Sequence, residues 1–304
     1  MKNNNKKFNM IILLYYIVLF SFTIYFILDT FTISKVYKVA NEKSFGTSSS
    51  DNLEQLETGD VSTTTNTYED DNIKITITEY YENNTKIYVA DIQLSSSSLL
   101  KTALADNSYG KNVTEKTSSI ASSVNAILAI NGDYYGAQES GYVIKNGTLY
   151  RNTKKNNQDD LVIYQDGSFE IINEDDITAE ELLENGAYNV LSFGPALIED
   201  DEIKVTSTTE VAKSMTSNPR TAIGIIDKNH YVFVVSDGRT TESQGLTLYQ
   251  LATFMKNLGV KTAYNLDGGG SSTMYFNGKV INNPTTNGNK ISERSVSDIV
   301  YIGY

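Results

Sequence analysis

The pattern of hydrophobic and polar positions divides the chain into three stretches. Residues 8–28 form an apolar run without a charged side chain. Residues 41–71 are rich in Ser, Thr, Asn, Asp and Glu and have almost no large apolar side chains. From Asn72 onward, apolar runs of strand length alternate with turn residues. This pattern predicts a membrane-spanning helix, a polar segment and a globular domain.

The apolar run is long enough to cross a bilayer, because a helix of about 20 apolar residues spans the hydrocarbon core. Lysines precede the run and Asp29 follows it, so the excess of positive charge predicts a cytoplasmic N-terminus and an extracellular C-terminal domain. A cleaved signal peptide is the competing interpretation. Its apolar region is only about 7–15 residues long and ends in small residues, a pattern that residues 29–37 lack. We therefore expect a single-pass protein of the cell membrane.

The domain boundaries follow from these composition changes. We expect a cytoplasmic tail at residues 1–7 and the transmembrane anchor at residues 8–28. Residues 29–71 are expected to be a juxtamembrane segment and flexible stalk, because so polar a segment buries too little apolar surface to pack. Residues 72–304 continue without a second polar gap of similar size, which favours one domain.

Several β-hairpins are predicted by their turn residues. Asn146-Gly147 and Asn277-Gly278 each separate two short apolar runs, and Asn-Gly in that position is the strongest local hairpin signal. Longer turns predict two more hairpins within residues 161–172 and 222–235. Antiparallel pairing is therefore expected to dominate.

The clearest helix is predicted over residues 248–258. Thr247 is its expected N-cap, Gln250 stands where a capping box requires it, and Gly259 marks the C-terminal end. A second helix is predicted over residues 117–124. Helices mixed with antiparallel strands, without a regular βαβ repeat, favour an α+β fold with a mixed, mostly antiparallel β-sheet core and packed helices.

The amino-acid composition limits which catalytic and metal-binding sites the chain can form. The chain has no cysteine, a single histidine and a formal net charge of −12, which argues against general binding to nucleic acid. An ordinary zinc site cannot be assembled from these residues, whereas Asp and Asn oxygens can still bind calcium or magnesium. We expect no required cofactor and leave a divalent ion open. His230 lies in a predicted turn, so a histidine-dependent triad is disfavoured and proton transfer falls to carboxylates.

Four polar segments directly adjoin apolar runs, where a rigid scaffold commonly presents functional groups. They are residues 131–136, 218–221, 236–239 and 265–273. Each of the first three is also explained by an ordinary turn. The fourth contains three consecutive glycines, more than a turn needs, and this favours close approach of a ligand to the backbone. Neither a G-x-G-x-x-G helix start nor a P-loop lysine accompanies them, so nucleotide binding is disfavoured.

Taken together and in this order, the four segments resemble the phosphodiester glycosidase family. The resemblance spans residues 73–304 and includes residues 192–197, 245–248, 282–284 and 293–298. The family's animal member removes N-acetylglucosamine from a sugar-1-phosphodiester to uncover mannose 6-phosphate. The present chain is similar to membrane-anchored, exopolysaccharide-associated bacterial members.

The resemblance implies an extracytoplasmic hydrolase that cleaves the glycosidic bond of sugar-1-phosphodiesters in exopolysaccharide or cell-wall glycans. Asp267 is the first candidate for the carboxylate that acts at the anomeric carbon, with Asp133, Asp237 and Glu293 as alternatives. Arginines are the expected clamps for the phosphate, since their planar fork grips two oxygens at once. The expected substrate-binding residues are Asn131, Arg220, Arg239, Asn265, Gly268, Gly269, Gly270, Ser271, Ser272 and Arg294.

Two other functions remain open at this stage. One is a non-catalytic surface protein that binds phosphorylated glycans through the same pocket. The other is a metal-dependent phosphodiesterase that cuts at phosphorus. Nothing in the pattern indicates an oligomeric state.

Overall fold

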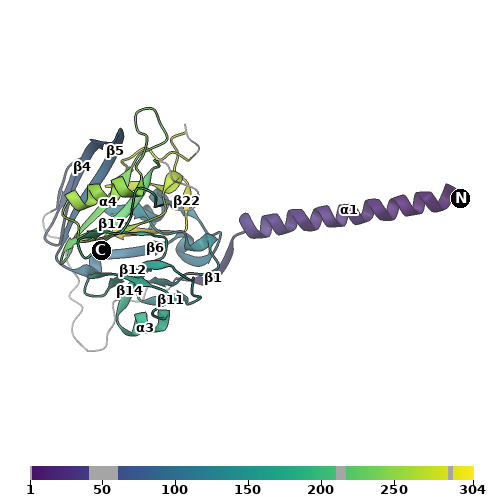
Figure 1. The fold of residues 1–304 in the computed structure, drawn as a ribbon, viewed down its shortest axis with the longest axis horizontal. Coiled ribbons are helices and arrows are strands. Elements are labelled where there is room, and N and C mark those ends of the chain that lie inside the picture. Colours follow the sequence, from purple (N-terminus) through teal and green to yellow (C-terminus); the bar gives the residue numbers. More distant parts are fainter. Residues whose placement is uncertain (1, 41–60, 210–216, 287–289) are drawn as a thin grey trace.

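The computed structural model describes residues 2–40, 61–209, 217–286 and 290–304 (Figure 1). A long helix, α1 (Lys2–Phe31), extends from one side of a domain that is rich in strands. Every pair of named strands in these ranges is antiparallel. The predicted α+β class with mostly antiparallel strands is confirmed.

The largest sheet has nine strands in the described residues, in the order β16-β15-β19-β17-β18-β5-β4-β3-β2. The hairpin predicted in residues 222–235 is confirmed. His230 is the first residue of β18 and pairs with Asp227, so placing it in the turn was wrong by one position. The strands are β2 (Ser62–Thr63), β3 (Thr67–Glu69), β4 (Ile73–Glu82), β5 (Thr85–Leu94), β15 (Ala196–Glu199), β16 (Glu202–Ile203), β17 (Arg220–Asp227), β18 (His230–Ser236) and β19 (Thr262–Asn265).

A second sheet has the order β21-β20-β9-β23-β6. Its predicted hairpin turns at Asn277 and Gly278, which have φ values of 45° and 84°, as a type I′ turn requires. Asn146 and Gly147 turn in the same way in a smaller hairpin, at 49° and 69°. The five strands are β6 (Leu100–Leu104), β9 (Leu128–Asn131), β20 (Met274–Phe276), β21 (Lys279–Val280) and β23 (Asp298–Ile302).

Smaller sheets complete the described domain. Three strands pair in the order β13-β12-β14, and the predicted hairpin in residues 161–172 is confirmed by β12 and β13. The remaining pairs are β10 with β11, β22 with β8, and β1 with β7. Their bounds are β1 (Lys35–Val39), β7 (Ser108–Lys111), β8 (Glu115–Lys116), β10 (Val143–Lys145), β11 (Thr148–Arg151), β12 (Asp159–Tyr164), β13 (Phe169–Asn173), β14 (Ala187–Leu191) and β22 (Ser295–Val296).

The two large sheets pack face to face and are covered by helices on their outer faces. Buried residues of both sheets, such as Phe233 of β18 and Ile130 of β9, form one hydrophobic cluster between them. Helix α4 (Leu248–Asn257) covers the other face of the nine-stranded sheet, and α2 (Thr117–Ser123) covers the other face of the five-stranded sheet. The core is therefore a four-layer arrangement of helix, sheet, sheet and helix.

Capping explains where the helices begin. The side chain of Thr247 accepts a hydrogen bond from the N–H of Gln250, and Gln250 accepts one from the N–H of Thr247, so the predicted capping box is confirmed. Gly259 follows the helix with a φ of 86°, as a C-terminal glycine does. Helix α3 (Ala179–Glu184), which we did not predict, begins with the same capping box.

The segment after α1 requires a correction. Residues 35–39 form β1 on the domain, and β2 and β3 join the nine-stranded sheet. The predicted flexible stalk at residues 29–71 is therefore wrong for these parts, and the domain extends N-terminally beyond Asn72. Composition misled here because a strand can pair through backbone hydrogen bonds whatever its side chains are. The rest of the predicted stalk, residues 41–60, lies outside the described residues.

Candidate active site

Asp267 lies two residues after β19 and forms an ion pair with Arg294. Nη2 of Arg294 donates to Oδ1 of Asp267 at 3.1 Å and to Oδ2 at 2.9 Å. Ser271 Oγ donates to the same Oδ2 at 2.6 Å. The short helix η4 (Gly269–Ser271) places Ser271 beside the carboxylate. The side chains of Asp267 and Arg294 are 12% and 42% exposed, so this pair opens to solvent.

The pKa of the Asp267 carboxyl is raised. Burial is the largest cause, and Arg294 and Ser271 partly oppose it. A carboxylate with a raised pKa is a stronger base than an exposed aspartate. The group is thus partly desolvated yet held in one orientation, which suits a residue that acts on a substrate.

Three arginines lie along the loop that carries this carboxylate, and we refer to Arg220, Arg239 and Arg294 as the arginine cluster. Arg294 pairs with Asp267, whereas Arg220 and Arg239 lie beside Gly268 and Gly269. Burial, with the charge of Arg239, lowers the pKa of Arg220 to about 10. Burial and the charge of Arg294 lower the pKa of Arg239. A nearby positive charge lowers the pKa of a guanidinium because it disfavours the charged form. The three positive charges of the cluster exceed the charge of Asp267, the carboxylate with which Arg294 pairs, and this favours binding of an anion.

Arg239 adopts a backbone conformation that residues with a side chain rarely adopt. Its φ is 64°, and the other residues with positive φ in the described ranges are Gly, Asn or Asp. The left-handed region costs other residues about 1–2 kcal/mol, and such strain often accompanies functional sites. The conformation brings the guanidinium to Gly269, while Nε and Nη2 donate to Asn218 Oδ1 at 3.2 and 3.1 Å.

We expect Arg239→Gly to separate stability from activity. Glycine accepts positive φ without strain, and the change also removes repulsion among the arginines. The free energy of unfolding should stay equal or rise by up to about 1 kcal/mol, while turnover of a phosphodiester substrate falls. Urea denaturation and steady-state kinetics would measure both. A marked loss of stability would contradict the strain argument.

The three glycines are packed closely against other parts of the protein. A Cβ on Gly268 would lie 2.9 Å from the carbonyl oxygen of Pro219, and one on Gly270 would lie 2.8 Å from Cα of Thr286. A Cβ on Gly269 would lie 2.8 Å from Nη2 of Arg239. A side chain at any of these three positions would therefore clash with the protein, whereas the close approach of a ligand to this backbone stays a prediction. Within the described chain, the N–H groups of Gly268 and Gly270 nevertheless have no acceptor.

Asn131, Asn265 and Ser272 are buried behind the site. Asn131 Nδ2 donates to the carbonyl of Asp267 at 2.7 Å, and its Oδ1 accepts from Thr221 at 2.8 Å. Asn265 Nδ2 donates to the carbonyl of Gly194 at 2.8 Å. Asn131 therefore holds the loop that carries Asp267, and Asn265 holds the end of β19 that leads into it. Ser272 Oγ has no hydrogen-bond partner among the described residues.

The other three candidate carboxylates are engaged elsewhere. Asp237 is buried and accepts from the N–H of Asn283 at 2.8 Å and from Asn282. Glu293 accepts from the N–H and Oγ of Ser118, at 2.9 and 2.6 Å, in the first turn of α2. Asp133 is also buried, although its charge reaches Asp267 and contributes to the raised pKa there.

Lys145 is a residue that the sequence analysis did not select. Its Nζ lies 3.0 Å from Asp133 Oδ2 and 2.7 Å from Asp298 Oδ2, and all three side chains are buried. Burial alone lowers the pKa of Lys145, but the two carboxylates together raise it. Burial and the charge of Asp133 raise the pKa of Asp298 to about 7. The sequence feature that could have indicated this cluster is a charged residue at the end of an apolar run: Lys145 ends one run and Asp298 starts another.

Burial of Asp160 is expected to make the free energy of unfolding depend on pH. It is fully buried, and neither Glu174 nor Ser192, its polar neighbours, reaches hydrogen-bonding geometry. Burial, then Glu174, raises the pKa of Asp160 well above its usual value. Above the unfolded pKa of 3.8, the folded state therefore binds more protons than the unfolded state. The stability that this extra proton binding contributes is lost as pH rises through the folded pKa.

We therefore expect Asp160→Asn to gain stability relative to the wild type as pH rises. Urea denaturation at about pH 5 and about pH 8 measures the difference, which should move in favour of the variant at the higher pH. An unchanged difference between the two pH values would contradict a raised pKa.

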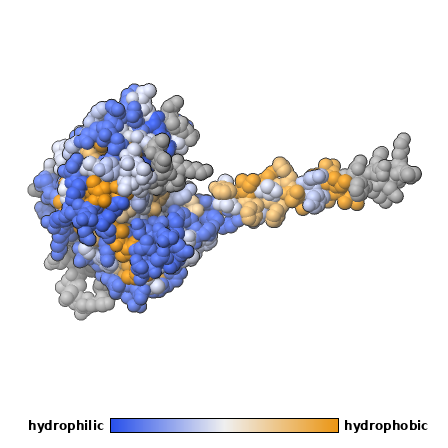
Figure 2. Space-filling model, viewed as in Figure 1, coloured by the Kyte–Doolittle hydropathy of each residue, from blue (hydrophilic) through white to orange (hydrophobic). Residues whose placement is uncertain are grey.

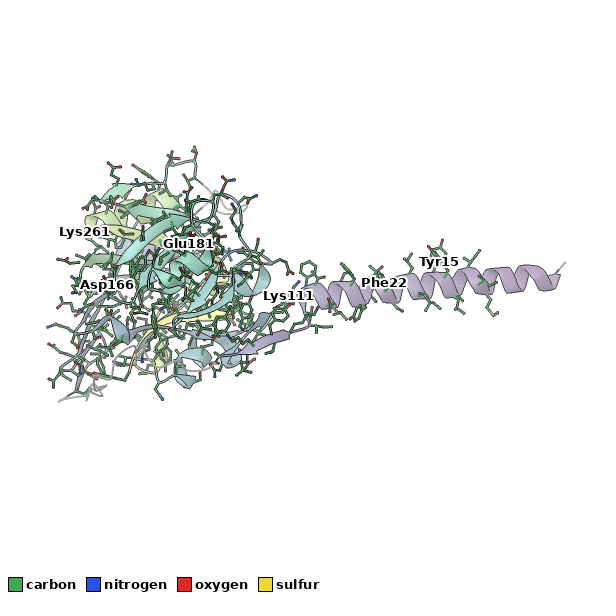
Figure 3. All side chains as sticks on the ribbon, turned by 90° about the horizontal axis from the view of Figure 1, so that it is seen from below. Tyr15, Phe22, Lys111, Asp166, Glu181 and Lys261 are labelled. Carbon is green, nitrogen blue, oxygen red and sulfur yellow. The ribbon has the colours of Figure 1, made fainter. Side chains whose placement is uncertain are left out.

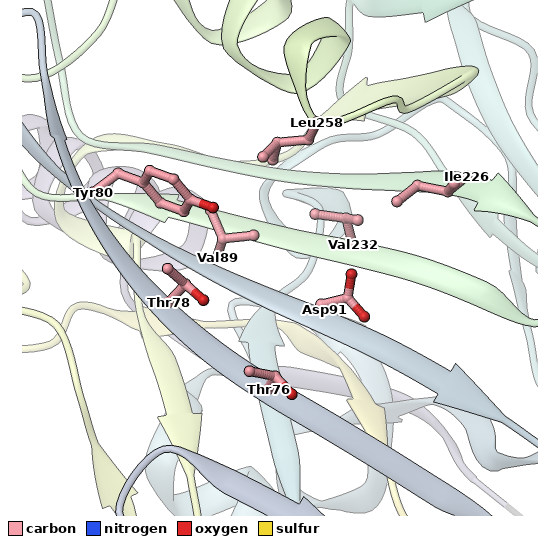
Figure 4. Close-up of a pocket in the computed structure, with 8 residues that line it drawn as sticks. All are labelled: Thr76, Thr78, Tyr80, Val89, Asp91, Ile226, Val232 and Leu258. Carbon is pink, nitrogen blue, oxygen red and sulfur yellow. The ribbon is translucent and has the colours of Figure 1, made fainter.

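Two hollows lie away from the arginine cluster. One, of about 300 Å³, lies between β4, β5 and the end of α4 and is lined by Thr76, Tyr80, Asp91 and Leu258, among others (Figure 4). The second, of about 580 Å³, includes Asp166 and Lys261. Neither contains a predicted site residue. No group of three or more His, Cys, Asp or Glu side chains suited to a metal occurs in the residues that the structure describes.

Comparison with known proteins identifies related chains. The family described as phosphodiester glycosidase matches residues 124–303. The uncharacterized SPbeta prophage-derived protein YomE of Bacillus subtilis is 30% identical over 64% of this chain and 31% of its own length. The N-acetylglucosamine-1-phosphodiester alpha-N-acetylglucosaminidase of Mus musculus is 35% identical over 34% of this chain and 19% of its own. The matched segments thus span less than a third of these relatives.

Solved structures share the fold. The catalytic domain of the zebrafish N-acetylglucosamine-1-phosphodiester alpha-N-acetylglucosaminidase, auto-inhibited by its pro-peptide, superimposes with a TM-score of 0.60 and 23% identity. The match covers 76% of this chain and 83% of that one. A hypothetical protein from Synechocystis gives a TM-score of 0.53 at 15% identity, over 76% of this chain and 62% of that one.

Proposed function

This chain belongs to the phosphodiester glycosidase family, and from that premise we propose that it cleaves the glycosidic bond of sugar-1-phosphodiesters in exopolysaccharide or cell-wall glycans outside the cytoplasm. The observation that carries the proposal is the arginine cluster along the loop of the partly exposed Asp267–Arg294 pair. Concentrated positive charge in a chain with a net charge of −12 points to a local anionic ligand.

The phosphate is the part of the substrate that this cluster would bind. Guanidinium groups can each donate two parallel hydrogen bonds to phosphate oxygens. The side chain of Arg294 is 42% exposed, and it now donates to Asp267. A bound phosphate would share Arg294 with Asp267 and accept from the N–H groups of Gly268 and Gly270, which have no acceptor among the described residues. Charge on the departing phosphate would be stabilised in this way.

Asp267 would act at the anomeric carbon. Glycoside cleavage passes through an oxocarbenium-like state, for which a carboxylate serves as nucleophile, as base for water or as electrostatic partner. A phosphate monoester leaves more readily than a sugar alcohol, so the reaction has less need of a second carboxyl group as acid. The engagement of Asp133, Asp237 and Glu293 elsewhere supports a mechanism that relies on one carboxylate and the arginines.

Helix α1 supports the location in this proposal. Its residues 10–31 are long and apolar enough to span a membrane, and none of that window is buried against the domain (Figure 2). Figure 2 shows apolar surface along the helix, whereas the domain surface in this view is mostly hydrophilic. We therefore propose a single-pass orientation with a cytoplasmic N-terminus and an extracellular domain.

The test uses the full chain in detergent micelles with a panel of sugar-1-phosphodiesters in oxygen-18 water. Release of a reducing sugar with the label on its anomeric carbon supports the proposal. Label on the phosphate would select a phosphodiesterase that cuts at phosphorus, with a divalent ion as the expected requirement. Tight binding with unchanged ligand would select a phosphoglycan-binding protein.

A further inference from the structure

The end of the anchor helix is fastened to the domain. Asn112, which follows β7, donates through Nδ2 to the carbonyls of Thr30 and Ile33, at 3.2 Å each. Ser34 Oγ in turn donates to the carbonyl of Asn112 at 2.8 Å. The last turn of an α-helix leaves carbonyls without intrahelical partners, so the domain satisfies one of them. The junction is therefore a set of hydrogen bonds and not a free tether.

Strand β1 adds a second connection immediately afterwards. It pairs with β7 over Lys35↔Lys111 to Val39↔Ser108, and the rings of Tyr37 and Tyr109 lie 5.9 Å apart. The four residues from Phe31 to Lys35 span at most about 14 Å even when fully extended. If α1 crosses the bilayer, β1 and the domain must lie at its surface, since each headgroup layer is only about 5–8 Å thick.

The surface at this junction suits the membrane interface. Several apolar side chains there are more than two-fifths exposed and are continuous with the anchor. Aromatic side chains favour the headgroup level, where one end is apolar and the other is wet. The exposed residues are Phe31, Ile33, Val36, Tyr37 and Val39.

One loop links this junction to the candidate active site. The N–H of Asn112 donates to the carbonyl of Gly136 at 3.0 Å, and the N–H of Asp267 donates to the carbonyl of Gly132 at 3.3 Å. The four steps along the chain from Gly132 to Gly136 span at most about 14 Å. Figure 1 also places β22, which directly follows Arg294, on the side of the domain from which α1 extends.

We propose that the domain rests directly on the membrane and that its substrates are sugar-1-phosphodiesters whose second ester is to a lipid of that membrane. The substrate half of this proposal rests on the function proposed above. A lipid-linked diester holds its phosphate at headgroup depth, where the arginine cluster reaches it, and presents its sugar outward. Hydrolysis adds water across the anomeric C–O bond, which releases the sugar and leaves a lipid phosphate in the bilayer.

Fluorescence energy transfer tests the position of the domain. The chain has no cysteine, so Glu139→Cys and Lys261→Cys each give a single labelling site. Glu139 pairs with Lys111, beside the end of α1, whereas Lys261 lies on the far side of the domain (Figure 3). With headgroup acceptors in vesicles holding the full chain, we expect strong transfer from position 139 and weak transfer from position 261. Equal transfer would overturn the docking.

Two matched insertions test the junction. A Gly/Ser segment of about 20 residues, with an average span of about 25 Å, is placed between Thr32 and Ile33 or, as the control, between Ser48 and Ser49. The first lengthens the connection from anchor to domain, whereas the second follows β1 and leaves that connection unchanged. Only the first should reduce transfer from position 139. An unchanged signal in the first variant would overturn the proposal.

Activity on two substrates then tests whether the enzyme acts on a lipid-linked diester. The same sugar phosphate is supplied as a long-chain alkyl diester in the vesicles and as a soluble methyl diester. The insertion before β1 should lower the rate on the vesicle substrate about ten-fold, because it lowers the effective concentration at the membrane. The rate on the soluble substrate should not change. Hydrolysis of the soluble diester alone would overturn the lipid substrate but leave the proposed function intact, whereas hydrolysis of neither diester would refute the proposed function.

Discussion

Replacing Asp267 with Asn is expected to lower turnover of a sugar-1-phosphodiester by about 10²–10⁴-fold, the usual range for loss of a positioned proton-transfer group. Asparagine has nearly the same shape, and its remaining oxygen can still accept from Arg294, which now donates to both oxygens of Asp267. It cannot act as a base or nucleophile at the anomeric carbon. Steady-state kinetics on the full chain, with thermal unfolding in parallel, would measure the effect.

Glu293→Gln is the matched control for this variant. It neutralises a candidate carboxylate that accepts hydrogen bonds from Ser118, in the first turn of α2. Turnover should stay near the wild-type value. Full activity in Asp267→Asn, or an equal loss in the control, would remove Asp267 from its proposed role. Loss of the folded state in Asp267→Asn would mark it as structural.

Lys145→Met is expected to lower the free energy of unfolding by about 3–5 kcal/mol, because it leaves two buried carboxylates without their shared cation. Lys145 contacts both Asp133 and Asp298 in the interior. Methionine fills a similar volume, so the loss reports on charge more than on packing. Urea denaturation of the full chain near neutral pH gives the difference.

Lys111→Met provides the comparison for the buried cluster. Lys111 pairs with Glu139, whose side chain is 78% exposed, and surface pairs of this kind contribute about 0–1 kcal/mol. The two substitutions remove the same group from the same residue type and differ mainly in burial. Similar losses from both would show that burial of the Lys145 cluster does not carry the effect.

Local signals explain which parts of the fold were predictable. The turns at Asn146-Gly147 and Asn277-Gly278 and the capping box of α4 each depend on residues close in sequence, and each is confirmed. The gathering of Asp267 with Arg294 and Ser271 also agrees with the motifs, since all three were selected from the sequence. Their roles remain predictions.

Long-range contacts explain what the sequence did not predict. Lys145 and Asp298 are separated by 153 positions, and neither flanking pattern indicates that β10 and β23 bring their charges together. The same holds for β1, whose partner β7 lies about 70 residues onward along the chain. The glycines at 268–270 were selected correctly as unusual, but the atoms that crowd them come from distant segments.

The pairing of β1 with β7 also determines whether proteolysis between β1 and β2 would separate the domain from α1. Residues 40 and 61, which bracket the segment between β1 and β2, both belong to the domain side of the junction. A cut between them would break the covalent path to the anchor but leave the two strands hydrogen-bonded. A two-stranded ladder is only marginally stable by itself. Separation of the cut domain from α1 would therefore be governed by strand dissociation, so it would be delayed and reversible.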